Sequence, residues 1–319
     1  MSIAIVQSEF GGPEVLTPVH VPTPSADDLG ADEVLVRVAA AGVNPIDVTT
    51  RSGGGMAGRT INVPYVPGWD LAGTVAAVGS DVNDLHPGQR VMGMARFPQA
   101  GNAYSQYTVV PAADLVPTPS HLSNEQAGAL PLAAMTAWQA FADTTRVGAG
   151  DRVLITGAGG GVGHLAIQIA HHLGATVIAI ASASKHEWLR ELGADVTIDY
   201  RDADAVAALA ADPVDVAFSL AAGSHAVAVN TVRKGGLLIA LGAGAAGVAD
   251  AAEKAGIRFA STAVHTQREW LTAVVDLAAR GMLTPTVSQV FDLTDAASAH
   301  RAIEDGHATG KIVLDASGE

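Results

Sequence analysis

The amino-acid sequence predicts an α/β protein that combines a β-rich part with a doubly wound parallel sheet. Short apolar or alternating runs fill residues 1–119, strands and helices alternate from Asp151 onward, and a glycine-rich turn joins a strand to a helix. The length of 319 residues is enough for two domains. We expect residues 1–122 and 263–319 to form the β-rich domain and residues 123–262 the parallel-sheet domain.

Composition excludes several classes of function. No apolar run approaches the roughly 20 residues of a membrane helix, and the start of the chain lacks the basic flank and apolar core of a secretory signal. The absence of cysteine excludes disulfides and thiolate metal ligands, which fits a cytoplasmic enzyme. A net charge of −14 argues against nucleic-acid and anionic-membrane partners. We therefore expect a cytoplasmic protein that acts on a small molecule.

The first part of the chain reads as strands. The runs IAIV, EVLVRVAAAGV, AGTVAAVG, QRVMGM and YSQYTVV are separated by clusters of Gly, Pro, Asn and Asp. They predict an irregular antiparallel barrel or sandwich, with a helical turn only near residues 45–51. Helices begin at Ser123, which stands three residues before Gln126 at the spacing of a capping box, and Pro131 allows a break between two helices.

From Asp151 the alternation of strands and helices predicts a parallel sheet covered on both faces. The expected strands are residues 152–156 and 176–181, then VTI, DVAFSL and GLLIAL. The expected helices are residues 162–173, residues 184–192 with a capping box of Ser184 and Glu187 and a stop at Gly193, AVAALAA, and a helix that ends at Arg233.

The end of the chain returns to the first domain in our interpretation. A helix over residues 266–280 has Thr266 and Glu269 at capping-box spacing and Gly281 as its stop. The strand VSQVF, a helix over residues 296–304 and the strand KIVLDA follow. This strand, helix and strand do not continue the nucleotide-type alternation, so we expect them to join the β-rich domain.

The stretch over residues 151–181, DRVLITGAGGGVGHLAIQIAHHLGATVIAIA, is the candidate cofactor site. Glycines in a tight turn let backbone amides approach a phosphate, and the helix start behind the turn adds the positive end of its dipole. A glycine turn between a strand and a helix, followed by a second strand, indicates a dinucleotide pyrophosphate site. The alternative is a turn that serves only close packing of the strand and helix.

The tip of the second strand predicts which dinucleotide binds. An acidic residue at this place binds the ribose hydroxyls of NAD. This chain has Ser182, Ser184 and Lys185 there, and no acid before Glu187. A lysine charge with hydroxyl donors favours a 2′-phosphate, so the tip selects NADP(H). In the alternative reading, Ser184 caps a helix and Lys185 is a solvated residue of the first turn.

The turn TGAGGGVG also fits short-chain dehydrogenases, which need a tyrosine four residues before a lysine. The four tyrosines are each followed, at the fourth position, by a residue other than lysine; they are Tyr65, Tyr104, Tyr107 and Tyr200. The short-chain fold is therefore excluded. It also begins with its glycine turn, whereas here about 150 residues precede the turn.

Motifs along nearly the whole chain support a different family. They are AAGVNPIDVTTRSG, VPGWDLAGTVAAVG, AYSQYTVVPAADLVPTPSHLSNEQAGALPLAAMTAWQAF, the glycine turn, LRELGAD with IDYRD, and GKIVL. With them the chain resembles the medium-chain dehydrogenase/reductase superfamily, in its zinc-independent quinone oxidoreductase (zeta-crystallin-like) branch. The resemblance implies a β-rich GroES-like catalytic domain and a Rossmann-type NADP-binding domain.

The resemblance also allows a direct test for zinc. A catalytic zinc needs about three Cys, His or carboxylate ligands. Where zinc-dependent relatives have a cysteine after the first long strand, this chain has Asn44, and where they have the histidine of a Gly-His-Glu motif it has Trp69. We therefore expect no metal. The histidines His164, His171 and His172 are expected to be packed or exposed residues of the nucleotide helix.

The activity implied by the resemblance is NADPH-dependent reduction of quinones or α,β-unsaturated carbonyl compounds. Without a Lewis acid, conjugated acceptors are easier to reduce than isolated carbonyls, because a hydrogen-bond donor can stabilise the charge on their oxygen. Asn44 matches a family position beside the nicotinamide and substrate, although Asn before Pro is also an ordinary turn residue. Asp47 and Arg51 complete this motif or pair with each other across one helical turn. Thr49 stands where some relatives have a tyrosine, so water is a candidate proton donor.

The resemblance assigns further residues to the cofactor. Thr136 falls near the nicotinamide phosphate, Lys185 and Tyr200 near the 2′-phosphate, and Lys311 near a phosphate or at a strand edge. The residues expected around the pyrophosphate are Gly157, Gly160, Gly161, Val162 and Gly163, and those at the ends of the next strands are Ser219, Leu241 and Gly242.

Two other functions stay open from the sequence, an enoyl-thioester reductase and a non-catalytic NADPH-binding protein with a structural or regulatory role. The first would need a basic patch for a carrier or coenzyme A phosphate, and Arg51, Arg59 and Arg96 are scattered. We expect a homodimer that pairs through an edge of the nucleotide sheet, with the apolar GLLIAL as the candidate edge.

Overall fold

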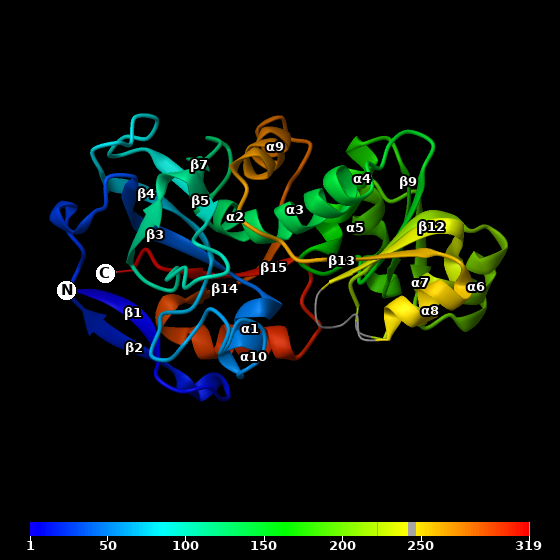
Figure 1. The fold of residues 1–319 in the computed structure, drawn as a ribbon, viewed down its shortest axis with the longest axis horizontal. Coiled ribbons are helices and arrows are strands. Elements are labelled where there is room, and N and C mark those ends of the chain that lie inside the picture. Colours follow the sequence, from blue (N-terminus) through cyan, green and yellow to red (C-terminus); the bar gives the residue numbers. More distant parts are fainter. Residues whose placement is uncertain (222, 242–246, 319) are drawn as a thin grey trace. The chain divides into compact units, whose positions relative to one another are not determined.

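The computed structural model describes residues 1–221, 223–241 and 247–318, and it divides into two units. Unit 1 contains residues 1–133 and 265–319, and unit 2 contains residues 134–264. The chain leaves unit 1 once and returns to it. The expected borders were at residues 122/123 and 262/263, so the structure assigns residues 123–133 to unit 1 (Figure 1).

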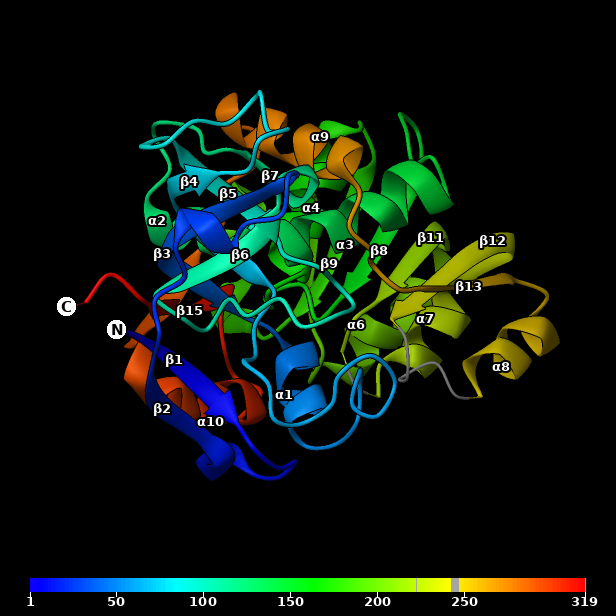
Figure 2. The same ribbon diagram turned by 60° about the vertical axis from the view of Figure 1, so that its left-hand side comes forward.

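Unit 1 is built on a seven-stranded sheet with the order β14-β15-β3-β4-β5-β7, in which β6 also pairs with β3. Its strands are β3 (Glu33–Val43), β4 (Asp70–Val78), β5 (Arg90–Met94), β6 (Tyr107–Pro111), β7 (Leu115–Pro117), β14 (Val287–Asp292) and β15 (Lys311–Asp315). All pairs are antiparallel except β14 with β15. A separate two-stranded sheet holds β1 (Ser2–Gln7) and β2 (Leu16–Val21) (Figure 2).

The C-terminal strand completes the sheet of unit 1. β15 pairs with the end of β3, where Ile312 lies opposite Val43. The apolar faces of these strands enclose one core with buried residues from both ends of the chain, among them Ile5, Val36, Leu71 and Leu314. The α-helices of unit 1 are α1 (Pro45–Arg51), α2 (Asn124–Ala129), α9 (Arg268–Ala279) and α10 (Ala296–Glu304), together with the first turn of α3 (Pro131–Trp138). The expected return of the last strands to the β-rich domain is confirmed.

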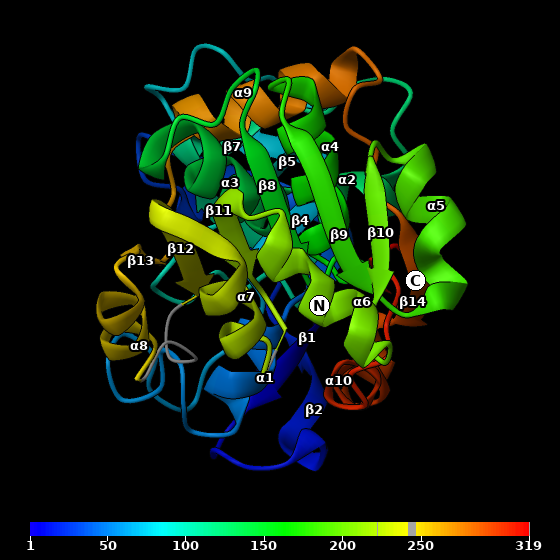
Figure 3. The same ribbon diagram turned by 90° about the vertical axis from the view of Figure 1, so that its right-hand side faces the viewer.

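Unit 2 is a six-stranded parallel sheet with the order β10-β9-β8-β11-β12-β13 (Figure 3). Its strands are β8 (Arg152–Thr156), β9 (Thr176–Ala181), β10 (Val196–Asp199), β11 (Val214–Ser219), β12 (Val232–Leu241) and β13 (Arg258–Thr262). The chain moves outward from β8 to β10 and then restarts at β11 on the other side of β8. Open α/β sheets bind their ligands at such a reversal, which here lies at the carboxyl ends of β8 and β11.

The helices between these strands follow the expected alternation. They are α4 (Gly163–His172), α5 (His186–Glu191), α6 (Ala203–Ala208), α7 (His225–Thr231) and α8 (Val248–Ala255). The predicted limits of β8 and β9 are those of the structure, and α4 is shorter than predicted by one residue at each end. His164 is buried and His171 and His172 are exposed, which are the two roles that the sequence allowed.

Several local predictions were wrong. Of the three capping boxes that the spacing predicted, only that of Ser123 forms. Helix α5 begins at His186 and helix α9 at Arg268, and neither has a side-chain cap. The Thr266 hydroxyl instead faces the carbonyl oxygens of Met94 and Phe97. Strand β13 was missed, and because it lies outside β12, GLLIAL is an interior strand and not a sheet edge. In the part of the chain that the structure describes, no helix is long and apolar enough to cross a bilayer.

Candidate functional site

The glycine turn of unit 2 forms between β8 and α4. Gly157 has φ of +63°, the left-handed region that favours glycine, and the amide of Gly160 donates to its carbonyl at 3.0 Å. A Cβ on Gly163 would stand 2.4 Å from the carbonyl oxygen of Gly157. The helix therefore starts in direct contact with the turn, an approach that a side chain at residue 163 would prevent.

The start of α4 has no side-chain cap. The residue before the helix is Val162, which carries no hydrogen-bonding group, and Gly160 to Val162 are half-exposed. A helix start without a capping side chain presents backbone N–H groups and the positive end of the helix dipole. Such an end binds phosphate, so the geometry of unit 2 fits the expected pyrophosphate site.

Lys185 lies against this turn. A Cβ built on Gly159 would lie 2.5 Å from Lys185 Cδ, so the aliphatic part of the lysine side chain packs directly against the backbone of this glycine. Ser182 and Ser184, at the end of β9, face each other with hydroxyl oxygens 3.3 Å apart. Because Ser184 caps no helix, the alternative reading of this serine as a cap is wrong. Partial burial lowers the pKa of Lys185.

The neighbouring strand β10 brings an acid to the same tip. Asp199 lies opposite Ala181, and its carboxylate accepts hydrogen bonds from the amides of Ala183 at 3.2 Å and Arg201 at 2.9 Å. These backbone donors occupy both oxygens, the Arg201 amide being the main cause of the lowered pKa of Asp199. This acid was not predicted, because it stands at the end of β10 and not after β9. Nor was Arg201 predicted, whose guanidinium lies 4.7 Å from the exposed ring of Tyr200.

Hydroxyl groups gather at the carboxyl ends of β8 and β11. The Ser219 hydroxyl lies 2.9 Å from both Ser224 Oγ and His225 Nδ1, and Ser224 Oγ lies 2.7 Å from Thr156 Oγ1. Ser219 is therefore part of a partly buried network of side chains. Leu241 is half-buried at the end of β12, Thr136 is buried in α3, and Gly242 lies outside the described residues.

In unit 1, the Asn44 side chain is held by two buried charged residues, each the first residue of a strand. Asn44 directly follows β3, Asp70 opens β4 opposite Gly42, and Lys311 opens β15. The amide nitrogen Nδ2 donates to Asp70 Oδ2 at 2.9 Å, and Lys311 Nζ donates to Asn44 Oδ1 and to the Val43 carbonyl at 3.3 Å. The Lys311 ammonium lies 3.8 Å from Asp70, and all three side chains are buried.

The opposite charges of Asp70 and Lys311 stabilise each other. Burial raises the pKa of Asp70 and lowers that of Lys311, while their mutual attraction opposes both shifts. Asp70 also accepts from the amide of Leu132 at 2.7 Å. The sequence analysis placed Lys311 at a cofactor phosphate or at a strand edge. Both placements need correction, because its ammonium is enclosed by Asn44, Asp70 and Val43 and β15 lies between β14 and β3.

Asp47 fixes the backbone of Asn44. Its Oδ2 accepts from the Asn44 amide at 2.7 Å, while its Oδ1 is buried without a hydrogen-bond partner. Burial raises the pKa of Asp47 to about 7, and the Asn44 amide opposes that shift. A carboxyl group with this pKa exchanges a proton near neutral pH. Thr49, in contrast, is exposed and donates to the Pro45 carbonyl within its own helix.

Arg51 does not pair with Asp47, contrary to one of the expected alternatives. Its guanidinium donates to the Gly11 carbonyl at 3.1 Å, to Glu304 and to His300 Nδ1 at 3.3 Å. Since an arginine only donates, the proton of neutral His300 resides on Nε2, which lies 3.1 Å from the Tyr104 hydroxyl. Arg51 thus joins α1 to α10, and no sequence motif indicated His300, Tyr104 or Glu304.

Replacing Arg51 by methionine should destabilise the protein by about 2 kcal/mol, because His300 and the Gly11 carbonyl lose a buried donor while Glu304 regains water. Urea unfolding followed by circular dichroism measures this loss. The matched control is R233M, since Arg233 is exposed and its ion pair with Asp215 should contribute less than about 1 kcal/mol. Equal losses in the two variants would contradict the structural role of Arg51.

The donor set of unit 1 does not fit zinc. The Asn44 oxygen already accepts from an ammonium, and Trp69 Nε1 donates to the Gln99 carbonyl at 2.6 Å. Neither residue offers a free metal ligand at the positions where zinc-dependent relatives bind the ion. Over residues 1–221, 223–241 and 247–318, no group of three His, Cys, Asp or Glu side chains is arranged to hold a metal.

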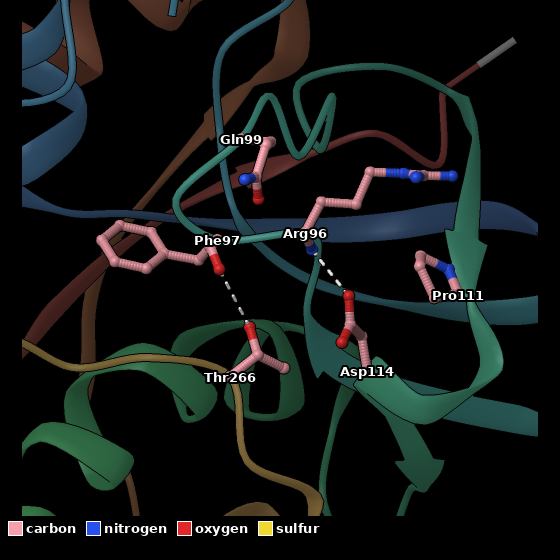
Figure 4. Close-up of a pocket in the computed structure, with 6 residues that line it drawn as sticks. All are labelled: Arg96, Phe97, Gln99, Pro111, Asp114 and Thr266. Atoms are coloured by element: carbon pink, nitrogen blue, oxygen red, sulfur yellow. Dashed lines mark hydrogen bonds between the residues drawn. The ribbon is translucent and has the colours of Figure 1, made fainter. Parts of the chain in front are cut away.

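A separate surface pocket in unit 1 contains none of the expected site residues. Figure 4 shows its lining: Arg96, Phe97, Gln99, Pro111, Asp114 and Thr266. Asp114 accepts from the Arg96 amide at 2.7 Å, the Arg96 guanidinium pairs with Glu33, and the Thr266 hydroxyl faces the Phe97 carbonyl. The polar groups of Arg96, Asp114 and Thr266 are therefore already hydrogen-bonded within unit 1, and we assign the pocket no ligand.

Comparison with known proteins agrees with this architecture. Residues 30–120 match the family of the alcohol dehydrogenase GroES-like domain, and residues 192–314 match a family described as zinc-binding dehydrogenase. The chain is 35% identical to the NADPH-dependent alkenal/one oxidoreductase of Arabidopsis thaliana, over 98% of this chain and 78% of that protein. It is 33% identical to the 2-methylene-furan-3-one reductase of Solanum lycopersicum, over 96% of this chain and 77% of that protein.

Solved structures give the same answer over the whole chain. The quinone oxidoreductase of Coxiella burnetii superposes with a TM-score of 0.89 at 35% identity, covering 98% of this chain and 99% of its own. The Escherichia coli quinone oxidoreductase, solved in complex with NADPH, superposes with a TM-score of 0.86 at 29% identity, with coverage of 98% and 99%. The chain therefore belongs to the medium-chain dehydrogenase/reductase superfamily, in its quinone oxidoreductase (zeta-crystallin-like) branch, and is an oxidoreductase.

Proposed function

We propose that this protein is a zinc-independent, NADPH-dependent oxidoreductase that reduces quinones or α,β-unsaturated carbonyl compounds. One observation carries the proposal. At the positions where zinc-dependent relatives bind their metal, this chain has a buried amide, Asn44, held between the ammonium of Lys311 and the carboxylate of Asp70. An amide N–H stabilises an oxygen on which negative charge develops, but it does not replace a Lewis acid for alcohol oxidation.

The reaction follows from that chemistry. Bound NADPH would supply the hydride for the far carbon of the conjugated C=C–C=O system, with NADP⁺ as the second product. The C=C electron pair moves toward the carbonyl, so the substrate becomes an enolate with its charge on oxygen. Asn44 donates a hydrogen bond to that oxygen, and a proton from water on the near carbon completes the saturated carbonyl compound. For a quinone, the same hydride and one proton give the hydroquinone.

The cofactor choice is supported by the tip of β9. Lys185 lies over the glycine turn, and Ser182 and Ser184 supply hydroxyl groups beside it. Asp199, the acid of this tip, accepts from two backbone amides. Arg201, beside Tyr200, adds a second positive charge. Cations and hydroxyl groups favour the 2′-phosphate of NADPH. Thr136, Ser219, Leu241 and Gly242 stay predicted contacts of the cofactor.

Replacing Lys185 by methionine should raise the Kd for NADPH at least about tenfold and leave the Kd for NADH within about twofold, because the lost charge-assisted contact, roughly 1.5–3 kcal/mol, involves only the 2′-phosphate. Fluorescence titration with each cofactor measures the two constants. K234M, at an exposed lysine of β12, serves as the control and should bind both cofactors like the wild type. Tighter binding of NADH than NADPH by the wild type would contradict the choice of cofactor.

A panel of substrates tests the activity. Consumption of NADPH should be seen with enones, enals or quinones and should be absent with saturated ketones, and reduction of NADP⁺ should be absent with primary alcohols. Activity that is abolished by a zinc chelator and restored by zinc would contradict the zinc-independent reaction. Tight NADPH binding without turnover of any acceptor would favour the alternative of a structural or regulatory NADPH-binding protein.

An enoyl-thioester substrate is less well supported by the arginines. Arg51 is buried on Glu304 and His300, and Arg96 pairs with Glu33, so neither offers its charge to a carrier or coenzyme A phosphate.

The assembly is a homodimer in our proposal. Its edge is not GLLIAL, since β10 and β13 are the outer strands of the parallel sheet. The cytoplasmic location also stays a prediction.

A further inference from the structure

We infer that Lys311 and Asp70 are positioning residues that lock the Asn44 amide in one orientation, so that Asn44 meets its ligand as a hydrogen-bond donor and not as an acceptor. This inference deepens the proposed function and rests on it for the identity of the ligand, a carbonyl or enolate oxygen of a conjugated acceptor. The lock itself rests on the contacts of unit 1 alone.

The orientation of the amide follows from the chemistry of its neighbours. An ammonium has only donors, so the Asn44 atom that faces Lys311 Nζ must be the oxygen. The nitrogen then faces Asp70 Oδ2 at 2.9 Å, where the carboxylate accepts. A flipped amide would place N–H groups against the ammonium and a carbonyl oxygen against the carboxylate. Both contacts would be repulsive in a buried site, so the flipped state is excluded.

The lock leaves a defined hydrogen-bonding capacity. Asp70 uses one of the two N–H groups of Asn44 Nδ2, and the backbone N–H is used by Asp47 at 2.7 Å. The Asn44 carbonyl accepts from the amides of Asp47 and Val48 at the start of α1. One side-chain N–H is therefore left for a ligand. A cation on the amide oxygen draws electron density from the nitrogen, which strengthens that N–H as a donor in a low-dielectric site.

The arrangement also explains two buried charges that the reaction does not otherwise use. Lys311 and Asp70 are 3% and 0% exposed and come from the first residues of two strands on either side of β3. A buried ion pair is seldom retained for stability alone, since an apolar pair of similar volume is often as stable. An ion pair can orient and polarise a neighbouring amide, whereas apolar side chains cannot.

The experiment is a double-mutant cycle between Asn44 and Lys311, with 3-penten-2-one as the acceptor and NADPH as the donor. N44A should lower kcat/KM about a hundredfold, which is the scale for removal of one oxyanion donor. K311M should lower kcat about tenfold or more in the wild type and less than about twofold in the N44A background, because it acts through Asn44. The Kd for NADPH should stay within about threefold in both. K254M, at an exposed lysine of α8, is the control for the Lys-to-Met change.

A second measurement does not depend on activity. In protein labelled with ¹⁵N at asparagine, the side-chain amide signal that disappears in N44A should move in K311M and stay in place in K254M. If K311M does not fold because Asp70 loses its partner, the neutral pair K311M/D70N replaces it in the cycle and in the spectra. Equal factors for K311M with and without Asn44, or an unmoved amide signal, would overturn the inference. An unreactive wild type with a displaced signal would instead overturn the proposed function alone.

Discussion

Between about pH 4 and 6.5, the free energy of unfolding should rise by about 3 kcal/mol with increasing pH in D47N and fall by about 3 kcal/mol in H300Q. The two slopes have the same size and opposite signs. In the wild type they should largely cancel, so that neither group is visible in an ordinary stability profile.

The sign for Asp47 follows from its raised pKa. Burial moves this pKa from 3.8 to about 7, so the folded protein holds a proton that the unfolded chain has released. The stabilisation is complete below pH 3.8 and is lost as the pH rises through about 7. The slope across this window is about 1.4 kcal/mol per pH unit. D47N removes it and keeps an oxygen for the amide of Asn44.

The sign for His300 is opposite. Burial, with the Arg51 charge beside it, lowers the pKa of His300 from 6.5 to about 3, so the unfolded chain binds a proton that the folded protein excludes. Stability is therefore lost as the pH falls from 6.5 toward about 3. H300Q removes this pH dependence of stability, and a glutamine side chain can still accept a hydrogen bond from Arg51 and donate one to Tyr104.

Urea unfolding at several pH values measures the profiles. The matched controls are D27N and H20Q, because both residues are exposed and the two changes should leave the wild-type profile unaltered. Parallel profiles for D47N and H300Q would contradict the opposite pKa shifts. A double variant D47N/H300Q should recover the wild-type profile if the two groups titrate independently.

Local chemistry explains which parts of the fold were predictable. The limits of β3, β8 and β9 were read correctly because an apolar run between turn residues is a local signal. The glycine turn was recognised for the same reason. Strand β13 escaped because its sequence, RFAST, is short and half-exposed, and β2 escaped because Pro18 interrupts it. The spacing of Ser184 and Glu187 predicted a helix from residue 184, but α5 begins two residues later, at His186, and its N-cap residue is Lys185.

The polar cluster of unit 1 could not be predicted because its members are far apart in the chain. Lys311 is 267 residues from Asn44, and only the return of β15 to the end of β3 brings them together. His300 and Arg51 meet in the same way, across 249 residues. The motif around Asn44 and Arg51 indicated that these two residues belong to the candidate site. Which side chain each one contacts depends on sheet topology, which no local pattern encodes.

The second large effect is expected at the glycine turn, where a series of alanine variants should follow the space available for a Cβ. The nearest atom would be 2.4 Å away at Gly163, 3.3 Å away at Gly160, and more than 4 Å away at Gly148. The atom in the way at both turn positions is the Gly157 carbonyl oxygen, which belongs to the backbone and cannot turn aside. G163A should therefore lower stability by about 2 kcal/mol and displace the start of α4, G160A should have a smaller effect, and G148A should have none.

Affinities for NADPH and NADH distinguish the role of the glycine turn from that of the tip of β9. The pyrophosphate is common to NADPH and NADH, so G163A should weaken both cofactors by the same factor, at least about tenfold. K185M should weaken NADPH alone, because only NADPH has the 2′-phosphate. Fluorescence titration of both cofactors with both variants gives the four constants. If G163A lost stability but kept its affinity, the pyrophosphate would bind elsewhere, and if it weakened NADPH selectively, the turn and not Lys185 would determine the choice of cofactor.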